Sequence, residues 1–159
     1  RGCPLAGDNP AAGDPIRRTG DQPPSPQGEY VAATSHGSLA MSAGMTPRVD
    51  GELVVVGRVG EEVTIEEASH AAGLAAGNAL AALAAELGGL HRIDTCLRMT
   101  VYIACGADFT SHSAVADGAS VEILDRLGSG SLPSRAAVGV ISLPGGSPVE
   151  VELTVAVRN

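Results

Sequence analysis

The stretch LPSRAAVGVISLPGGSPVEVELTVAV, residues 132–157, decides the fold of this chain. A proline fixes the backbone just before Ser134, a run of small residues follows, and Pro144 with two glycines predicts a turn. After the turn, apolar and polar residues alternate, which is typical of a strand with one buried face. The pattern predicts two C-terminal strands that bring Arg135 and Glu150 near one sheet edge. A guanidinium with a carboxylate nearby can bind a small carboxylate ligand and position a water molecule.

Regular structure is predicted from Tyr30 onwards. Thr64 followed three residues later by Glu67 forms a capping-box pattern, and the Ala/Leu run after it ends at two glycines, so one long helix is predicted. Gly73 and Gly77 would let this helix lie close on a sheet. The remaining predictions are three short N-terminal strands, a long strand and a second helix, at residues 30–36, 39–43, 53–57, 93–103 and 109–127.

This order of elements predicts an α+β domain, a mixed sheet with both helices on one face. Arg98, Glu150 and Glu152 fringe the opposite face, which two helices cannot cover, so that face is expected to need a partner. Residues 1–29 are rich in proline, glycine and polar residues and are predicted to form a disordered or loosely ordered arm. Residues 30–159 are predicted to form the folded domain.

Composition limits the chemistry. The chain has 159 residues, 44% of them hydrophobic and only 2% aromatic, so one domain with a core of Ala, Val, Leu and Ile is expected. The net charge of -8 argues against nucleic acid as the main partner. Lysine is absent, which excludes Schiff-base chemistry and lysine-anchored pyridoxal phosphate. No apolar stretch is long enough to span a bilayer, and a cytoplasmic protein without membrane contact is expected.

Cysteine and histidine spacing predicts neither a disulfide framework nor a metal site. Cys96 falls on the polar face of the long strand and Cys105 at its end, so a reactive thiol is possible, although buried or inert cysteine is the more common outcome. The histidines are expected to be solvated or to cap helices; they are His36, His70, His91 and His112.

Several motifs resemble the YjgF-like Rid family (reactive intermediate deaminase, formerly endoribonuclease L-PSP). SAGMTP at 42–47 with DGELV at 50–54, the helix around Asn78, and VYI at 101–103 with Asp108-Phe109 are similar to family segments in the same order. With the LPSR stretch, the resemblance covers roughly residues 30–157. It implies a chorismate-mutase-like fold and a homotrimer with ligand clefts between subunits.

The resemblance also implies a function without a cofactor. Enamine or imine deaminases of this family hydrolyse 2-imino or 2-enamino acids to 2-keto acids and ammonia. On this reading Arg135 binds the substrate carboxylate, Glu150 positions the attacking water, and Tyr30, Gly44 and Ser113 line the cleft. Without the resemblance, the same residues have simpler interpretations: a solvated Arg135, a solvated or ion-paired Glu150, and a plain turn at Gly44.

Three positions depart from the family's deaminase pattern. Ala43 stands where serine is usual, Met45 where glutamine is usual, and Ser113 where the helix usually supplies asparagine. Each change reduces hydrogen-bonding capacity, which suggests a divergent branch. Two further hypotheses therefore stay open: a non-catalytic trimer that binds a small carboxylate or imine metabolite, and a biosynthetic enzyme on the same scaffold that accepts a larger substrate.

Overall fold

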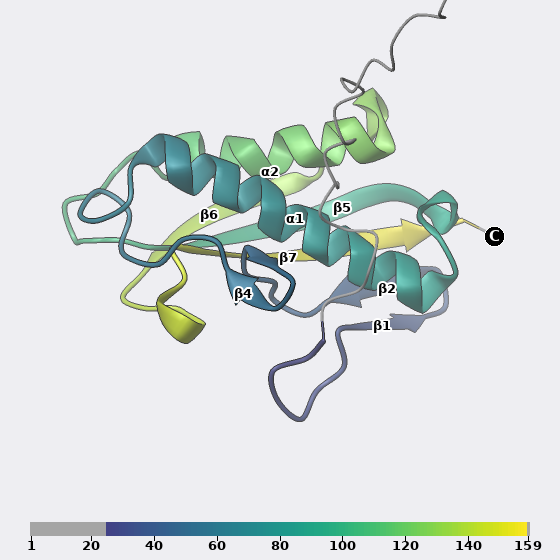
Figure 1. Ribbon diagram of the computed structural model, residues 1–159. Helices are drawn as coiled ribbons and strands as arrows, with labels where there is room; N and C mark the ends of the chain where they lie inside the picture. The colour runs from purple at the N-terminus through teal and green to yellow at the C-terminus, as the bar shows by residue number, and fades with distance from the viewer. Residues whose placement is uncertain (1–24, 159) are drawn as a thin grey trace, which may run out of the picture.

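The computed structural model describes residues 25–158, which form a five-stranded mixed sheet with two helices on one face (Figure 1). The strands lie in the order β1-β2-β7-β5-β6. The bounds of the main elements are β1 (Ala33–His36), β2 (Leu39–Ser42), α1 (Ile65–Leu87), β5 (Ile93–Ala104), α2 (His112–Leu127), β6 (Ser134–Val140) and β7 (Val149–Val157). The predicted arrangement of sheet and helices is confirmed. Residues 1–24 of the predicted arm lie outside the described residues.

β5 joins the two C-terminal strands, because it pairs parallel with β6 on one side and antiparallel with β7 on the other. Met99 of β5 lies beside Arg135 of β6, and Tyr102 of β5 lies beside Glu150 of β7. Met99 and Tyr102 are three residues apart, so their side chains leave β5 on opposite faces. Their neighbours Arg135 and Glu150 therefore also leave the sheet on opposite faces.

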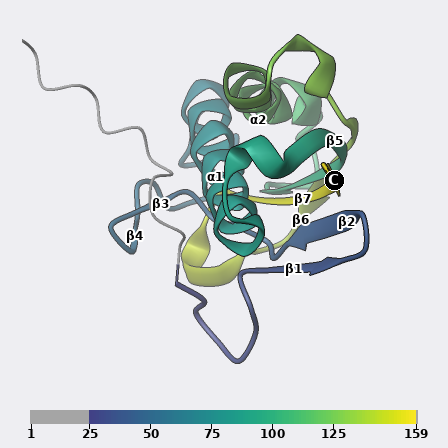
Figure 2. The same cartoon turned by 90° about the vertical axis from the view of Figure 1, so that its right-hand side faces the viewer.

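The core lies between the sheet and the helices (Figure 2) and is built from small aliphatic side chains. The predicted alternation along residues 149–157 is confirmed: Val149, Val151, Leu153 and Val155 are at most 1% exposed. The buried surface of α1 consists largely of alanines with helical spacing; they are Ala68, Ala71, Ala72, Ala75, Ala76, Ala79 and Ala82.

The capping box predicted at the start of α1 is confirmed. Thr64 Oγ1 accepts a hydrogen bond from the backbone N–H of Glu67 at 3.2 Å, and Glu67 Oε2 accepts one from the backbone N–H of Thr64 at 2.9 Å. Gly88 ends the helix with φ 86°, in the left-handed region that favours glycine. No helix within residues 25–158 is both long and apolar enough to cross a membrane.

Glycines bring the two helices close together. A Cβ on Gly73 would lie 3.2 Å from the carbonyl oxygen of Gly118, and a Cβ on Gly118 would overlap the carbonyl oxygen of Ser69. Gly73 thus allows α1 to pack closely against α2. The sequence predicted instead that it would allow α1 to pack closely against the sheet. This contact fixes how α2 sits over β5 and β6.

Three predicted boundaries were wrong. The first strand begins at Ala33 rather than at Tyr30. The third strand, expected at residues 53–57, is reduced to a hairpin of β3 (Arg48–Val49) and β4 (Glu52–Leu53) that forms its own small sheet. Val54 and Val56, which follow this hairpin, are 46% and 58% exposed, because no sheet covers this part of the chain. The second helix begins at His112 rather than at Phe109, whose ring packs edge-to-face against that of His112.

The expected position of Cys96 was also wrong. Register shifts between Ile93 and Thr95 and between Cys96 and Arg98 interrupt the alternation of β5. A bulge of this kind reverses the faces of the residues that follow it. Cys96 is therefore only 2% exposed and Leu97 is 43% exposed, and burial raises the pKa of the Cys96 thiol to about 11.

The helix–helix contact yields a test. Gly118→Ala should lower the free energy of unfolding by roughly 1–3 kcal/mol, because the added Cβ forces apart two helices that touch through their backbones. Chemical denaturation measures the change. Gly130→Ala is the control, since a Cβ there meets nothing within 4 Å. Equal stabilities of the two variants would contradict the close contact.

Candidate functional site

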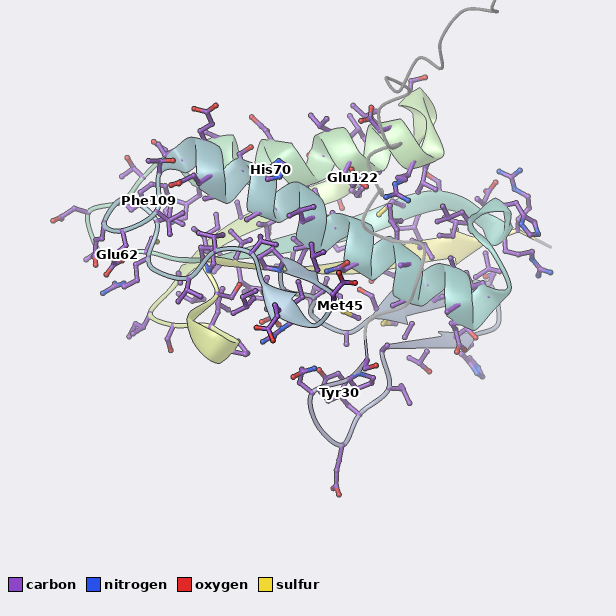
Figure 3. The ribbon with its side chains drawn as sticks, viewed as in Figure 1. Tyr30, Met45, Glu62, His70, Phe109 and Glu122 are labelled. Atoms are coloured by element: carbon purple, nitrogen blue, oxygen red, sulfur yellow. The ribbon has the colours of Figure 1, made fainter. Side chains whose placement is uncertain are left out.

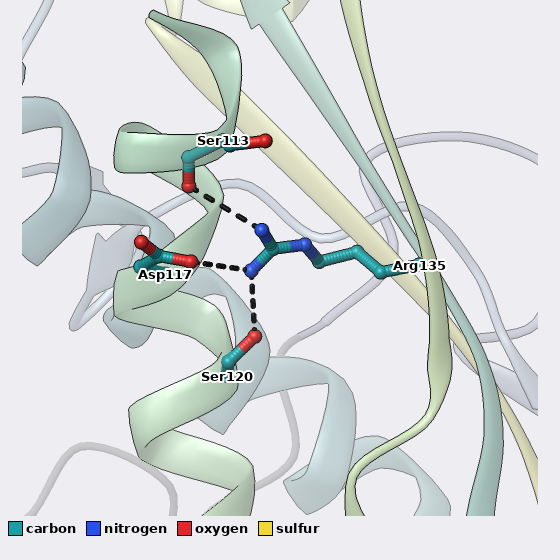
Figure 4. A network of polar contacts seen from close by, with 4 residues as sticks. All are labelled: Ser113, Asp117, Ser120 and Arg135. Carbon is teal, nitrogen blue, oxygen red and sulfur yellow. Dashed lines mark hydrogen bonds and ion pairs between the residues drawn. The ribbon is translucent and has the colours of Figure 1, made fainter.

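Arg135 lies near the start of the edge strand β6, and its side chain reaches helix α2 (Figure 4). Nη1 donates hydrogen bonds to Oδ1 of Asp117 and Oγ of Ser120, both at 2.8 Å, and Nη2 lies 3.5 Å from the carbonyl oxygen of Ser113. The side chain of Arg135 is 22% exposed and that of Asp117 is 66% exposed. The ion pair thus sits where the helix–sheet interface meets solvent.

These contacts orient the guanidinium while leaving one of its edges available. Within residues 25–158, Nε of Arg135 makes no hydrogen bond and Nη2 makes only the long contact to Ser113. Nε and Nη2 lie on one edge of the planar group, and two parallel N–H groups are what a carboxylate accepts bidentately. Arg135 can therefore bind an anion without releasing Asp117.

Ser113 is brought to Arg135, but through its backbone. Its carbonyl oxygen faces the guanidinium from the first turn of α2, whereas the residue itself is exposed. Asp117 and Ser120 were missed as site residues. The sequence contained one signal for them, a spacing of three that places both on one helix face. Nothing in the sequence showed that this face lies over β6.

Gly44 and Glu150 form a second cluster, on the sheet face away from the helices. Met45 and Val151 exchange two backbone hydrogen bonds, of 2.8 Å and 2.9 Å, and this pairing brings the segment before Met45 onto β7. A Cβ on Gly44 would overlap Oε1 of Glu150. Glycine is needed here because the carboxylate occupies the space of a side chain.

The segment that carries Gly44 is held by α1. Asn78, buried in the middle of the helix, donates from Nδ2 to the carbonyl oxygens of Thr46 and Arg48, both at 3.0 Å. Ser42 fixes the other side, because its Oγ accepts the backbone N–H of Leu153 at 3.0 Å. These bonds satisfy buried polar groups and set the position of Gly44 against β7.

Glu150 is half-buried beside a second carboxylate. Burial, and then the negative charge of Glu152, raise the pKa of Glu150. Tyr102 donates its hydroxyl to Oε1 of Glu152 at 3.0 Å, and burial together with this bond raises the pKa of Tyr102. A carboxylate with a raised pKa can act as a general base or acid near neutral pH.

Arg135 and Glu150 do not meet within one chain, which corrects the prediction that they share one sheet edge. β5 lies between their strands, and the registers send the two side chains to opposite faces of the sheet. Arg135 points to α2, while Glu150 lies on the face that carries no helix. A site that uses both residues needs a second copy of the chain.

Tyr30 is placed apart from both clusters. It is 48% exposed on the bend that leads into β1 (Figure 3), and its hydroxyl accepts the backbone N–H of Gln27 at 3.2 Å. Within the described part of the chain, no group of three or more His, Cys, Asp or Glu side chains could hold a metal ion.

The open sheet face also exposes apolar side chains. Leu39 and Met41 of β2 and Val138 of β6 are paired in register with residues of this face, and they are 39–48% exposed. Together with Glu150 and Glu152 they form a mixed apolar and acidic surface. Such a surface is suited to contact between protein chains.

Comparisons with known proteins agree on a family. A sequence model of a protein family, described as "YjgF/chorismate_mutase-like, putative endoribonuclease", matches residues 23–153. Protein TCP17 of Trypanosoma cruzi is 32% identical over 136 residues, 85% of each chain. The structure of Atu1372 from Agrobacterium tumefaciens, a protein of unknown function, is similar with a TM-score of 0.79 at 35% identity over 82% of each chain. A Shewanella oneidensis protein named a "putative endoribonuclease" has a TM-score of 0.81 at 28% identity, over 85% of this chain and 89% of its own.

The electrostatics of Glu150 predict a pH dependence of stability. Because its pKa is raised on folding, the folded state binds the Glu150 proton more tightly than the unfolded state does. This stabilisation is complete below the ordinary glutamate pKa of about 4.3 and is lost as pH rises through the folded-state pKa. Glu150→Gln should therefore be more stable than the wild type at pH 7, and the difference should vanish near pH 4.

Denaturation at fixed protein concentration over this pH range measures the effect. Glu52→Gln, at an exposed position of β4, is the control and should change stability little at any pH. A Glu150→Gln protein that is less stable than the wild type at pH 7 would show that the carboxylate is stabilised by a partner.

Proposed function

Because the chain belongs to the YjgF/chorismate-mutase-like family, we propose that it is a deaminase that hydrolyses small 2-imino or 2-enamino acids to 2-keto acids and ammonia without a cofactor. The observation that carries the proposal is the oriented guanidinium of Arg135, with its Nε–Nη2 edge available. A nuclease function is not proposed, because the net charge of -8 does not suit phosphate binding.

In the proposed complex, Arg135 binds the substrate carboxylate with Nε and Nη2. Asp117 and Ser120 keep the guanidinium in place by holding Nη1. Preorganisation of this kind lowers the cost of ordering a side chain on binding. Tyr30, Gly44 and Ser113 are proposed to line the same cleft. Because the substrate carboxylate is bonded to the carbon of the C=N bond, holding it at Arg135 sets the position of that carbon relative to the attacking water.

The proposed reaction consumes one water and releases one ammonia. A 2-enamino acid first takes a proton on its β-carbon and becomes the imine. Water then adds to the carbon of the C=N bond, and the resulting carbinolamine expels ammonia as the C=O bond forms. Glu150 is the proposed base that takes a proton from the attacking water, and its raised pKa suits this exchange. No oxidant or reductant is required.

We propose that the site forms between copies of the chain in a homotrimer. Arg135 and Glu150 leave opposite faces of one sheet, so one chain cannot supply both to a small substrate. The open face, with exposed Leu39, Met41 and Val138, is the proposed contact surface. In such an assembly Arg135 of one subunit would face Glu150 of the next.

One observation favours a second function, binding without turnover. Within one chain Asp117 orients Arg135 and leaves its Nε–Nη2 edge available, whereas Glu150 lies on the other face of the sheet. If the chains do not assemble so that these residues meet, Arg135 alone could still bind a small carboxylate. The following variants separate the two functions.

Arg135→Lys should lower kcat/KM for freshly generated 2-iminopropanoate by about 10²–10³, or roughly 3–4 kcal/mol, because an ammonium cannot form the planar two-bond contact. A coupled assay of 2-keto acid release measures it. Arg92→Lys, at an exposed position, is the matched control and should keep full activity. Unchanged turnover in Arg135→Lys would exclude Arg135 as the carboxylate ligand.

Mixed assemblies test the site between subunits. Arg135→Lys and Glu150→Gln proteins should each be nearly inactive, while trimers assembled from an equal mixture should recover roughly a quarter of the wild-type activity by random pairing. Light scattering after gel filtration confirms the trimer. Recovery fails if one chain supplies both residues, and a stable monomer would contradict the assembly. Binding that persists in Glu150→Gln while turnover never occurs even in the wild type would favour the binding function.

A further inference from the structure

A pocket of about 720 Å³ lies beyond the ends of β5 and β6 and does not include Arg135 or Glu150. Its walls come from the turn after β5, the start of α2 and the end of β6, and include Arg58, Cys105, Phe109, His112, Gly139 and Ile141. The volume is in the range of small-molecule sites. Ile141 is 85% exposed, so the pocket has an open rim.

A thiol and an imidazole face each other in this pocket. Sγ of Cys105 lies 3.7 Å from Nε2 of His112, and Cys105 is 7% exposed. The packing holds the pair in place, because Phe109 stacks edge-to-face on the His112 ring with centroids 5.1 Å apart. Phe109 lies at the same end of the molecule as Glu62 (Figure 3).

Gly139 of β6 allows this approach. A Cβ at this position would lie 2.7 Å from Nε2 of His112 and 3.1 Å from Sγ of Cys105. Only glycine lets the strand backbone pass next to the pair without displacing it. The thiol and imidazole are thus confined between a strand, a helix start and an aromatic ring.

Arg58 supplies a positive charge to the pocket. Its Nη2 donates to the carbonyl oxygen of Cys105 at 2.5 Å, while Nη1 lies farther, 3.7 Å, from Oε1 of Glu61. Within the described residues, the buried Nε of Arg58 has no hydrogen-bond partner. Burial raises the pKa of the Cys105 thiol, with a smaller contribution from the negative charge of Glu61, and the charge of Arg58 acts in the opposite direction. The thiol therefore needs a base to become a nucleophile, and His112 is the base within reach.

We propose that this pocket is a second reactive site, in which Cys105 adds covalently to small electrophiles that carry a carboxylate. His112 Nε2 accepts the thiol proton when the ring proton is on Nδ1. Sulfur then forms a bond to the β-carbon of an α,β-unsaturated carbonyl compound that carries the carboxylate, and the π electrons move to the α-carbon. The α-carbon takes the proton back from His112. Arg58 binds the carboxylate and stabilises the charge that develops.

Alkylation of the intact protein tests the proposal, with Cys96 as an internal control because it is a buried thiol without a histidine contact. Peptide mapping after limited treatment with iodoacetamide or iodoacetate gives the rate at each cysteine. Cys105 should react at least about tenfold faster than Cys96, and His112→Gln should remove about tenfold or more of that rate, as for loss of a positioned base. The ratio of iodoacetate to iodoacetamide reactivity at Cys105 should exceed that of free cysteine.

Arg58→Met should lower the ratio of iodoacetate to iodoacetamide reactivity at Cys105 to that of free cysteine. Arg58→Lys, which keeps the charge, should preserve the ratio of the wild type. Arg135→Lys should leave the alkylation of Cys105 unchanged, which separates this site from the proposed deaminase site. Thermal unfolding checks that each variant is folded. The proposal is overturned if wild-type Cys105 reacts no faster than Cys96, a result that needs no variant. It is also overturned if folded His112→Gln reacts at the wild-type rate, or if the iodoacetate preference is absent or survives in Arg58→Met.

Discussion

The pairing of β5 with both C-terminal strands is the constraint on which the rest of the structure depends. β6 pairs parallel and β7 antiparallel with β5. Arg135 of β6 lies opposite Met99 and Glu150 of β7 lies opposite Tyr102, and these two β5 residues are an odd number of positions apart. Side chains alternate along a strand and Met99 is buried in the core, so this register places Arg135 on the helix face and Glu150 on the open face. The polar chemistry of the chain is thereby divided between the two sides of one sheet.

Small residues determine what each side can do. On the helix face, Gly118 lets α2 touch α1, and this places Asp117 and Ser120 over β6, within reach of Arg135. On the open face, Gly44 leaves room for the Glu150 carboxylate. A larger residue at Gly118 would push α2 away from α1, and one at Gly44 would displace the Glu150 carboxylate, so close backbone packing and the geometry of the candidate site have the same physical origin.

The start of α2 connects two polar environments of different character. Ser113 directs its carbonyl oxygen to Arg135, where a charged pair meets solvent, and the preceding residue His112 faces Cys105 inside a pocket. One environment presents the guanidinium of Arg135 near solvent, and the other holds a buried thiol beside an imidazole. Neighbouring residues of one helix turn thus contact two different groups, because Ser113 uses its backbone carbonyl and His112 its side chain.

The sequence by itself determined the elements whose signals are local. The capping box at Thr64, the alternation of residues 149–157 and the turn at Pro144 all predicted what the structure contains, because backbone geometry and burial follow from neighbouring residues. The choice of Arg135 and Glu150 as candidates also came from local motifs. Only the tertiary structure decided that a bulge buries Cys96, that Asp117 pairs with Arg135, and that Glu150 lies on the other face. These features depend on register and helix placement, which long-range packing sets.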